Sequence, residues 1–293
     1  MKNKTKLNLL NSAGIYIRDM VQQNPENRMP DVDMETIFEA PLLGVADGYD
    51  PLFDQYKEII GPYHKTPEEI ILEIYDDIDE TQGLSVLCWA LPFSASIRKS
   101  NYRKSTIPSY RWCRGTEDGE RFNNLLRKNL EVFFKGKGIK AVAAVSSSAW
   151  KRIEDLPGGH TSNWSERHAL YAAGMGTFSL SDGFITDKGM AMRCGSIIVN
   201  ADLPKSERMY QSHVENCLFH AKGLCKKCID RCPAGAISGN GHDKVLCRTF
   251  REKFFGEFLH DKCGMDIEPG MCGLCQTNVP CESTNPMAAS KKA

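Results

Sequence analysis

The chemistry most visible in the sequence belongs to cysteine, because nine of the 12 cysteines fall after residue 200. The central run is Cys225-Lys-Lys-Cys228-Ile-Asp-Arg-Cys232-Pro233. Its C-x2-C-x3-C-P spacing matches the latter part of the bacterial ferredoxin run, in which the cysteine before proline binds a different cluster from its neighbours. The spacing therefore predicts iron–sulfur ligands.

Two 4Fe–4S clusters need eight thiolates, and the segment offers nine. Lysine stands at position 222, where the ferredoxin run would begin, and Cys217 is the natural substitute. We expect one cluster on Cys217, Cys225, Cys228 and Cys281. We expect the other on Cys232, Cys247, Cys272 and Cys275, which leaves Cys263 over.

Zinc and disulfides are the alternatives for this segment. Structural zinc also uses C-x2-C pairs, although it does not require a reciprocal cysteine before proline. The N-terminus lacks the apolar stretch and cleavage site of a signal peptide, which favours a cytoplasmic protein with reduced thiols. No run of 18 apolar residues predicts a membrane span. Outside the clusters we expect buried or spare thiols at Cys88, Cys113, Cys194 and Cys263.

The net charge of zero combines two segments of opposite sign. Residues 51–80 carry nine acids against two lysines, and residues 94–140 carry twelve bases against four acids. The plain interpretation is two solvated faces that partly neutralise each other. The alternative is that the basic segment receives an anionic ligand or an acidic redox partner.

The remaining pattern predicts the elements that position these residues. Apolar periodicity predicts helices over 5–21, 67–77, 120–136 and 164–173. Continuous apolar runs predict buried strands over 84–91, 139–146 and 194–200. Strands alternating with helices favour an α/β fold. We expect three parts: a mostly helical segment 1–80, an α/β domain 81–200 and a cysteine module 201–293.

Several short motifs precede the cysteine module in a recognisable order. They are Tyr110-Arg-Trp-Cys-Arg-Gly, Leu125-Leu-Arg-Lys, Glu166-Arg167, Gly174-Met-Gly176 and Cys194-Gly-Ser-Ile. Together with the isolated Cys247, this order resembles epoxyqueuosine reductase and, more distantly, the reductive dehalogenases, over roughly residues 84–285. Both are corrinoid-dependent iron–sulfur enzymes.

The resemblance implies a nitroreductase-like α+β domain that binds cobalamin and substrate, followed by a two-cluster ferredoxin-like module. Gly174 and Gly176 would then allow close approach to the flat corrin. The residues expected to bind the corrinoid are Ser146, Ser147, Ser148, Gly174, Met175, Gly176, Thr177, Cys194, Gly195 and Ser196. Low-potential electrons would come from a ferredoxin or flavodoxin under anaerobic conditions. Two alternatives are a protein that reduces the corrinoid of a partner and a corrinoid-free 4Fe–4S reductase.

One departure from the family concerns the proton donor. The family places an aspartate before Ser-Ala-Pro, and Ser147 stands in that place here, although a serine is a poor acid. Tyr110 and His160 are therefore the further candidates for the catalytic acid. The net charge of zero, and a length without room for tRNA-binding repeats, predict a small organic substrate in place of tRNA.

Overall fold

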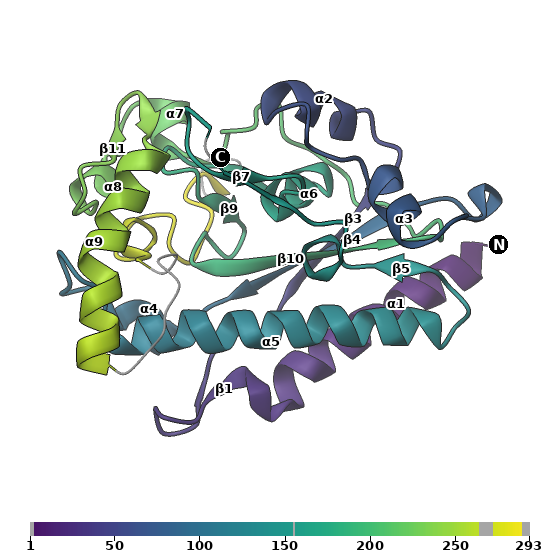
Figure 1. The fold of residues 1–293 in the computed structure, drawn as a ribbon, viewed down its shortest axis with the longest axis horizontal. Coiled ribbons are helices and arrows are strands. Elements are labelled where there is room, and N and C mark those ends of the chain that lie inside the picture. Colours follow the sequence, from purple (N-terminus) through teal and green to yellow (C-terminus); the bar gives the residue numbers. More distant parts are fainter. Residues whose placement is uncertain (1–2, 155, 264–271, 289–293) are drawn as a thin grey trace.

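A four-stranded antiparallel sheet forms the centre of the computed structural model, which describes residues 3–154, 156–263 and 272–288 (Figure 1). The strand order is β3-β4-β10-β5, with β3 at Leu42–Asp47, β4 at Ser85–Pro92, β10 at Met192–Val199 and β5 at Ala141–Val142. β4 and β10 pair over their full lengths, from Ser85 with Val199 to Pro92 with Met192. The expected mixture of helices and strands is present, and neighbouring strands of this sheet run antiparallel.

Helices cover both faces of the sheet, which explains why the β4 run is apolar without alternation. Leu87, Trp89 and Leu91 pack into a core shared with α1 (Asn3–Gln23) and α5 (Tyr110–Lys135). The side chains between them, such as Val86 and Ala90, face a second core. That core is shared with α2 (Leu52–Ile59), α3 (Pro67–Ile74) and α6 (Glu166–Ala172).

The first 80 residues contribute to this same body. Strand β3 pairs with β4 across the boundary that we expected near residue 80. α1 corresponds to the predicted helix 5–21 and lies beside α5 (Figure 1). The turn η1 (Pro25–Asn27) and the hairpin of β1 (Arg28–Met29) and β2 (Glu35–Thr36) also contact α5 or each other. α3 begins on a capping box between Thr66 and Glu69.

α5 begins well before the predicted start at residue 120, because Ser109 caps it through its Oγ, 3.0 Å from the Trp112 backbone nitrogen. The sequence did not predict this extension, because two glycines interrupt the helical pattern of α5. A Cβ at Gly119 would lie 2.6 Å from the Phe38 ring, so glycine allows α5 to approach the core closely. Gly115 makes room for Ile97 of α4 (Ala95–Ser100) in the same way.

Several shorter elements complete the part of the chain that precedes the cysteine module. The predicted strand 139–146 is β5 followed by the 3-10 turn η3 (Ala144–Ser146), and η2 (Glu80–Gln82) precedes β4. The predicted helix 164–173 is α6, which ends before Gly174 at φ +68°. Two hairpins flank it, β6 (Arg152–Ile153) with β7 (Thr161–Ser162) and β8 (Gly176–Phe178) with β9 (Phe184–Thr186).

The cysteine-rich segment packs at one end of the sheet, on the left in Figure 1. Its elements are α7 (Leu218–Lys222), α8 (Lys227–Asp230), β11 (Ile237–Ser238), β12 (Gly241–His242), α9 (Lys244–Cys263) and η4 (Leu274–Gln276). The last described segment is hydrogen-bonded to the residues just before β10. The backbone nitrogens of Met190 and Ala191 donate to the carbonyls of Cys281 and Glu282. Among the described residues, no helix has the length and apolarity to cross a membrane.

Candidate active site

The structure brings the first expected set of cysteines together. Cys217 precedes α7, Cys228 lies in α8, and Cys281 arrives from the C-terminal segment. Burial, followed by the neighbouring thiols Cys217 and Cys225, raises the pKa of Cys228 to about 11. The same two causes raise the pKa of Cys281 to about 12. All four thiols line one small cavity, and we call them the outer quartet.

The second expected set also converges. Cys232 follows α8, Cys247 lies in the first turns of α9, and Cys272 and Cys275 flank the start of η4. Burial raises the pKa of Cys272 to about 12 and also raises the pKa of Cys275, and the other thiols of the set add to both shifts. We call these four the inner quartet because all of them border the large cavity described below.

The described cysteines are free thiols. Cys88 in β4 and Cys113 in α5 are fully buried in the core, as expected of structural thiols. The side chain of Cys263 lies outside the described residues. Where the structure describes side chains, no three histidine, cysteine, aspartate or glutamate residues converge closely enough to hold a single metal ion.

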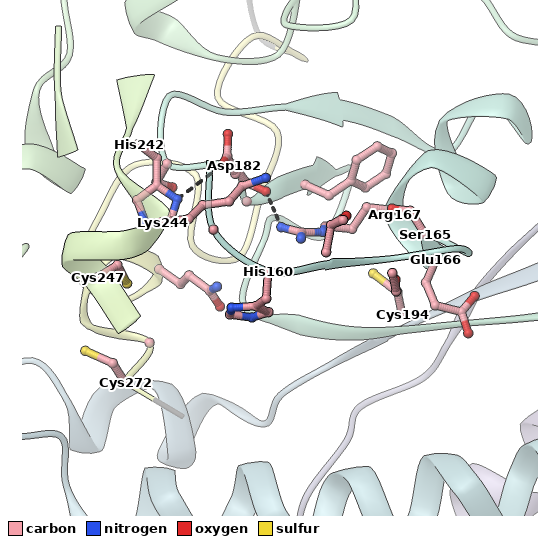
Figure 2. Close-up of a pocket in the computed structure, with 18 of the residues that line it drawn as sticks. His160, Ser165, Glu166, Arg167, Asp182, Cys194, His242, Lys244, Cys247 and Cys272 are labelled. Atoms are coloured by element: carbon pink, nitrogen blue, oxygen red, sulfur yellow. Dashed lines mark hydrogen bonds and ion pairs between the residues drawn. The ribbon is translucent and has the colours of Figure 1, made fainter. Parts of the chain in front are cut away.

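A cavity of about 940 Å³ separates the inner quartet from the α/β layer (Figure 2). One wall comes from α5, α6 and β10, and the opposite wall comes from α9 and the inner quartet. The β6–β7 hairpin and the segment before it add Trp150, Arg152 and His160. The volume is at the upper end of the range for small-molecule sites. The arrangement places a large chamber directly beside four half-buried thiols.

A buried charge network forms the α/β side of this chamber. Glu166, the first residue of α6, accepts hydrogen bonds from Ser196 and from Arg127, the latter at 3.3 Å. Arg127 is 2% exposed and also binds Glu120 at 2.8 Å. Burial raises the pKa of Glu166, although Arg127 acts in the opposite direction. The network holds the start of α6 against β10 and keeps a carboxyl group at the cavity wall.

His160 is the predicted catalytic candidate that reaches the cavity (Figure 2). Its Nδ1 lies 3.2 Å from an Arg248 guanidinium nitrogen, and Arg248 also binds Glu154 at 2.8 Å. Burial and then the charge of Arg248 lower the pKa of His160. The imidazole is therefore neutral at physiological pH and can accept a proton.

Another hydrogen-bonded chain reaches the inner quartet. Asp182 accepts a hydrogen bond from His242 at 3.1 Å, and its backbone carbonyl accepts one from Arg167 (Figure 2). The bonds to Asp182 and to Cys247 raise the pKa of His242 to about 9. Burial by itself would raise the pKa of Cys247, but His242 and Arg251 more than offset burial, so that this pKa is lowered.

Two of the predicted acids lie away from the cavity. Tyr110 is the first residue of α5 and is 41% exposed. Ser147 uses its hydroxyl within a local turn, where it donates to the Ala144 carbonyl at 2.8 Å and accepts from the Ala149 nitrogen at 3.2 Å. Neither residue lines the cavity, and their role as catalytic acids stays a prediction. Ser146 and Ser148 are exposed and do not line it either.

The glycine element packs against protein instead of facing the cavity. A Cβ at Gly174 would lie 2.2 Å from the Glu207 carbonyl oxygen, and one at Gly176 equally close to the Ile185 carbonyl oxygen. Met175 fills the space beside Gly44. Thr177 accepts a hydrogen bond from the Asn216 nitrogen at 2.8 Å. These contacts dock the start of the cysteine module, so their expected role in corrin binding is not supported by their positions.

Of the three β10 residues expected at the corrin, only Cys194 lines the cavity. Gly195 instead allows the Trp89 indole to lie against the strand, since a Cβ there would be 2.2 Å from that ring. Ser196 lies beneath the wall, where it accepts a hydrogen bond from the Trp164 indole at 3.1 Å and donates one to Glu166.

Sequence reasoning missed several residues that the fold brings to the cavity. They include Trp150, Arg167, Asp182, His242 and Lys244. Asp182 carried a local signal, because Ser-Asp-Gly favours a turn and Asp182 adopts φ +58° there. His242 and Lys244 carry no such local sequence signal, since only tertiary packing brings them near Asp182.

Comparison with known proteins supports the resemblance. No family model matches the chain. An epoxyqueuosine reductase from Bacillus anthracis is 32% identical over 125 residues, which cover 41% of this chain and 30% of that enzyme. This relative confirms the resemblance to epoxyqueuosine reductases predicted from the sequence, and that family consists of oxidoreductases. The chain thus spans less than a third of the length of its curated relative.

Solved structures of epoxyqueuosine reductase are also similar. One from Bacillus subtilis, with its catalytic loop swung out of the active site, has a TM-score of 0.46 and 18% identity over 94% of this chain and 65% of that one. A complex with a tRNA-Tyr stem loop that carries epoxyqueuosine has a TM-score of 0.47, with the same identity and coverage.

These relatives overturn one expectation from the sequence. We expected a small organic substrate in place of tRNA, and that expectation is wrong, because a related reductase binds an epoxyqueuosine-modified tRNA stem loop. A net charge of zero does not exclude a nucleic acid, because local basic surface, not total charge, meets the phosphate backbone.

Proposed function

We propose that this chain is an iron–sulfur oxidoreductase of the epoxyqueuosine reductase type, which carries two 4Fe–4S clusters and reduces epoxyqueuosine in tRNA. The single observation that carries the proposal is the inner quartet of thiols in the wall of the large cavity. That arrangement allows electrons to reach a bound substrate or cofactor without crossing solvent.

The thiols of both quartets suit iron. At Cys228, Cys272 and Cys281, burial and the neighbouring thiols disfavour the ionised form in the protein alone, as their raised pKa values indicate. Bound iron supplies the positive charge that stabilises thiolates at such a site. Clusters held by the two quartets would supply a path for single electrons from the outer quartet to the inner quartet and the cavity.

The cavity suits a corrinoid in volume and in lining. Trp150, Met192 and Cys194 offer apolar contact on the α/β side, and Thr161 and Ser162 offer polar contact on the β7 side. When bound, a corrinoid supplies a cobalt centre that reacts as a low-potential nucleophile. The protein would hold it, exclude water and orient the substrate.

The substrate follows from the relatives and from the charges at the cavity. Arg152, Arg167 and Lys244 line it and provide positive charge for an RNA backbone. Removal of an epoxide oxygen as water consumes two electrons and two protons, so that the site needs a proton source as well as electrons. His160 is the candidate, because phosphate charge beside it would raise its pKa toward neutrality.

The decisive experiment is anaerobic purification with added cobalamin, followed by metal analysis and incubation with an epoxyqueuosine-containing RNA stem loop. We expect about eight irons and about one cobalt per chain, and conversion of the RNA base to queuosine. Iron without cobalt, with conversion retained, would replace the proposal by a corrinoid-free reductase. Zinc in place of iron would overturn it.

Variants separate the roles of individual residues. His160→Gln should lower turnover and change its pH profile, while the exposed His213→Gln should leave both unchanged. Cys88→Ala should keep all of the iron, because Cys88 lies in the core away from both quartets. An unchanged pH profile for His160→Gln would remove His160 from proton transfer.

A further inference from the structure

A turn of the basic front segment lies directly against the cysteine module. Arg231 of the module donates hydrogen bonds to the carbonyl of Asn101 at 3.0 Å and to that of Lys104 at 2.6 Å. From the other side, the Tyr102 hydroxyl donates to Glu282 at 2.8 Å. Glu282 follows Cys281 of the outer quartet, and Arg231 precedes Cys232 of the inner quartet, so the turn 101–104 is attached to the module beside both quartets.

This contact attaches the exposed cations of the turn to the module that carries a second group of exposed cations, and we call the two groups together the basic face. Its members are Arg103, Lys104, Lys222, Lys226 and Lys227. Among described residues, no ion pair engages the first four, and Lys227 lies 3.7 Å from Asp230. Leu224 stands within the same stretch and is 77% exposed, the highest exposed fraction among the large apolar side chains that the structure describes. A basic surface around an exposed leucine is typical of a docking site.

Two lysines of the basic face are chain neighbours of outer-quartet thiols. Cys225 stands between Leu224 and Lys226, and Cys228 directly follows Lys227. None of the residues of the basic face lines the large cavity, whose wall contains the inner quartet. A partner bound on these lysines would therefore lie beside outer-quartet thiols without occupying the cavity.

We propose that the basic face docks a small acidic electron-carrier protein, which donates one electron at a time to the outer quartet. This inference rests on the two clusters of the proposed function. In each encounter the carrier is oxidised by one electron and the outer cluster is reduced by one, with no bond made or broken. Opposite charges steer the encounter, and Leu224 provides apolar contact near the electron-accepting thiols.

A nucleic acid is the other class of partner that a basic surface could bind. The location argues for the carrier, because RNA must reach the large cavity to be reduced, and none of the residues of the basic face lines that cavity. Tyr102, the aromatic side chain of the turn, is hydrogen-bonded to Glu282 instead of being free to stack on bases.

The test uses the protein loaded with both clusters and a reduced ferredoxin of net negative charge. Stopped-flow absorbance follows reduction of the clusters in the wild type and in Lys222→Glu/Lys226→Glu/Lys227→Glu. The triple variant should be reduced at least about tenfold more slowly at low salt, and the wild-type rate should fall as salt rises. Reduction by 5-deazariboflavin, an uncharged photoreductant, should be equal in both proteins.

A matched control reverses charge elsewhere. Lys128→Glu/Lys135→Glu alters two exposed lysines of α5, away from the cysteine module, and should leave the ferredoxin rate within about twofold. Equal slowing in this control, an unchanged rate in the triple variant, or no reduction of the wild type by the carrier would each overturn the docking proposal. Loss of RNA-stem-loop affinity in the triple variant, with the carrier rate unchanged, would assign the surface to RNA. Normal carrier reduction without RNA turnover would refute the proposed substrate and leave the docking site standing.

Discussion

A buried histidine next to the cavity wall makes acid stability the most direct test of the structure. His64 is 1% exposed, and neither of its ring nitrogens has a hydrogen-bond partner within the described structure. Its ring stacks on Trp164 at 6.1 Å and meets Tyr56 edge-on. Burial, the largest cause, lowers the pKa of His64 to about 4.

The sign and the size of the effect follow from proton binding. Between pH 6.5 and about 4 the unfolded chain protonates this imidazole, and the folded protein does not. Stability is therefore complete above the unfolded pKa and falls as the pH drops toward the folded one. From pH 7 to pH 5 the free energy of unfolding should decrease by about 2 kcal/mol on account of His64 alone.

The assay compares denaturant unfolding of the wild type and His64→Phe at pH 7 and pH 5, with the exposed His213→Phe as control. The informative quantity is the loss of stability between the two pH values, so that imperfect packing of phenylalanine does not affect the conclusion. The wild type and the control should lose about 2 kcal/mol more than His64→Phe. Equal losses in all three proteins, or an NMR titration of His64 near its ordinary pKa, would refute the reasoning.

Three other predictions concern the clusters and the core. Cys232→Ala should reduce bound iron from about eight to about four per chain, measured by metal analysis, because Cys232 belongs to one quartet only; loss of all or none contradicts the grouping. Arg231→Ala should destabilise the protein by about 3 kcal/mol and release iron faster during dialysis, since its guanidinium binds four carbonyls, of Asn101, Lys104, Leu274 and Thr277. Arg231→Lys should recover part of the lost stability. Equal iron retention by the wild type and Arg231→Ala would show that the contacts of Arg231 do not hold the turn 101–104 and the cysteine module together. Gly119→Ala should cost about 1–3 kcal/mol in denaturant unfolding because its Cβ would meet the Phe38 ring, whereas Gly136→Ala at the helix end should be tolerated.

The grouping of cysteines could be anticipated because it depends on local rules. A cysteine before proline cannot serve the same cluster as its C-x2-C neighbours, and this separates Cys232 from Cys225 and Cys228. In the same way, the continuous apolar run of β4 indicated burial on both faces before any partner was known. That the quartets hold iron stays a prediction.

The errors share a physical cause, since each involved a small residue whose neighbour lies far away in sequence. Gly115 and Gly119 interrupt the helical pattern of α5 because Ile97 and Phe38 need the space. Gly174 was expected to face a flat cofactor, but the backbone at Glu207 occupies that position. Ser147 has a partner in its own turn, and a hydroxyl engaged locally is not presented to a cavity.

The last thiols of both quartets come from the C-terminal segment, and this determines the order in which the protein matures. Cys272 and Cys275 complete the inner quartet, and Cys281 completes the outer one. During synthesis the central sheet, whose strands end at Val199, can form long before those residues leave the ribosome. The inner set of four is incomplete until residue 275 has emerged, and the outer set until residue 281 has emerged and its carbonyl has accepted the hydrogen bond from Met190. The proposed clusters would therefore be loaded onto a central sheet that can already have formed.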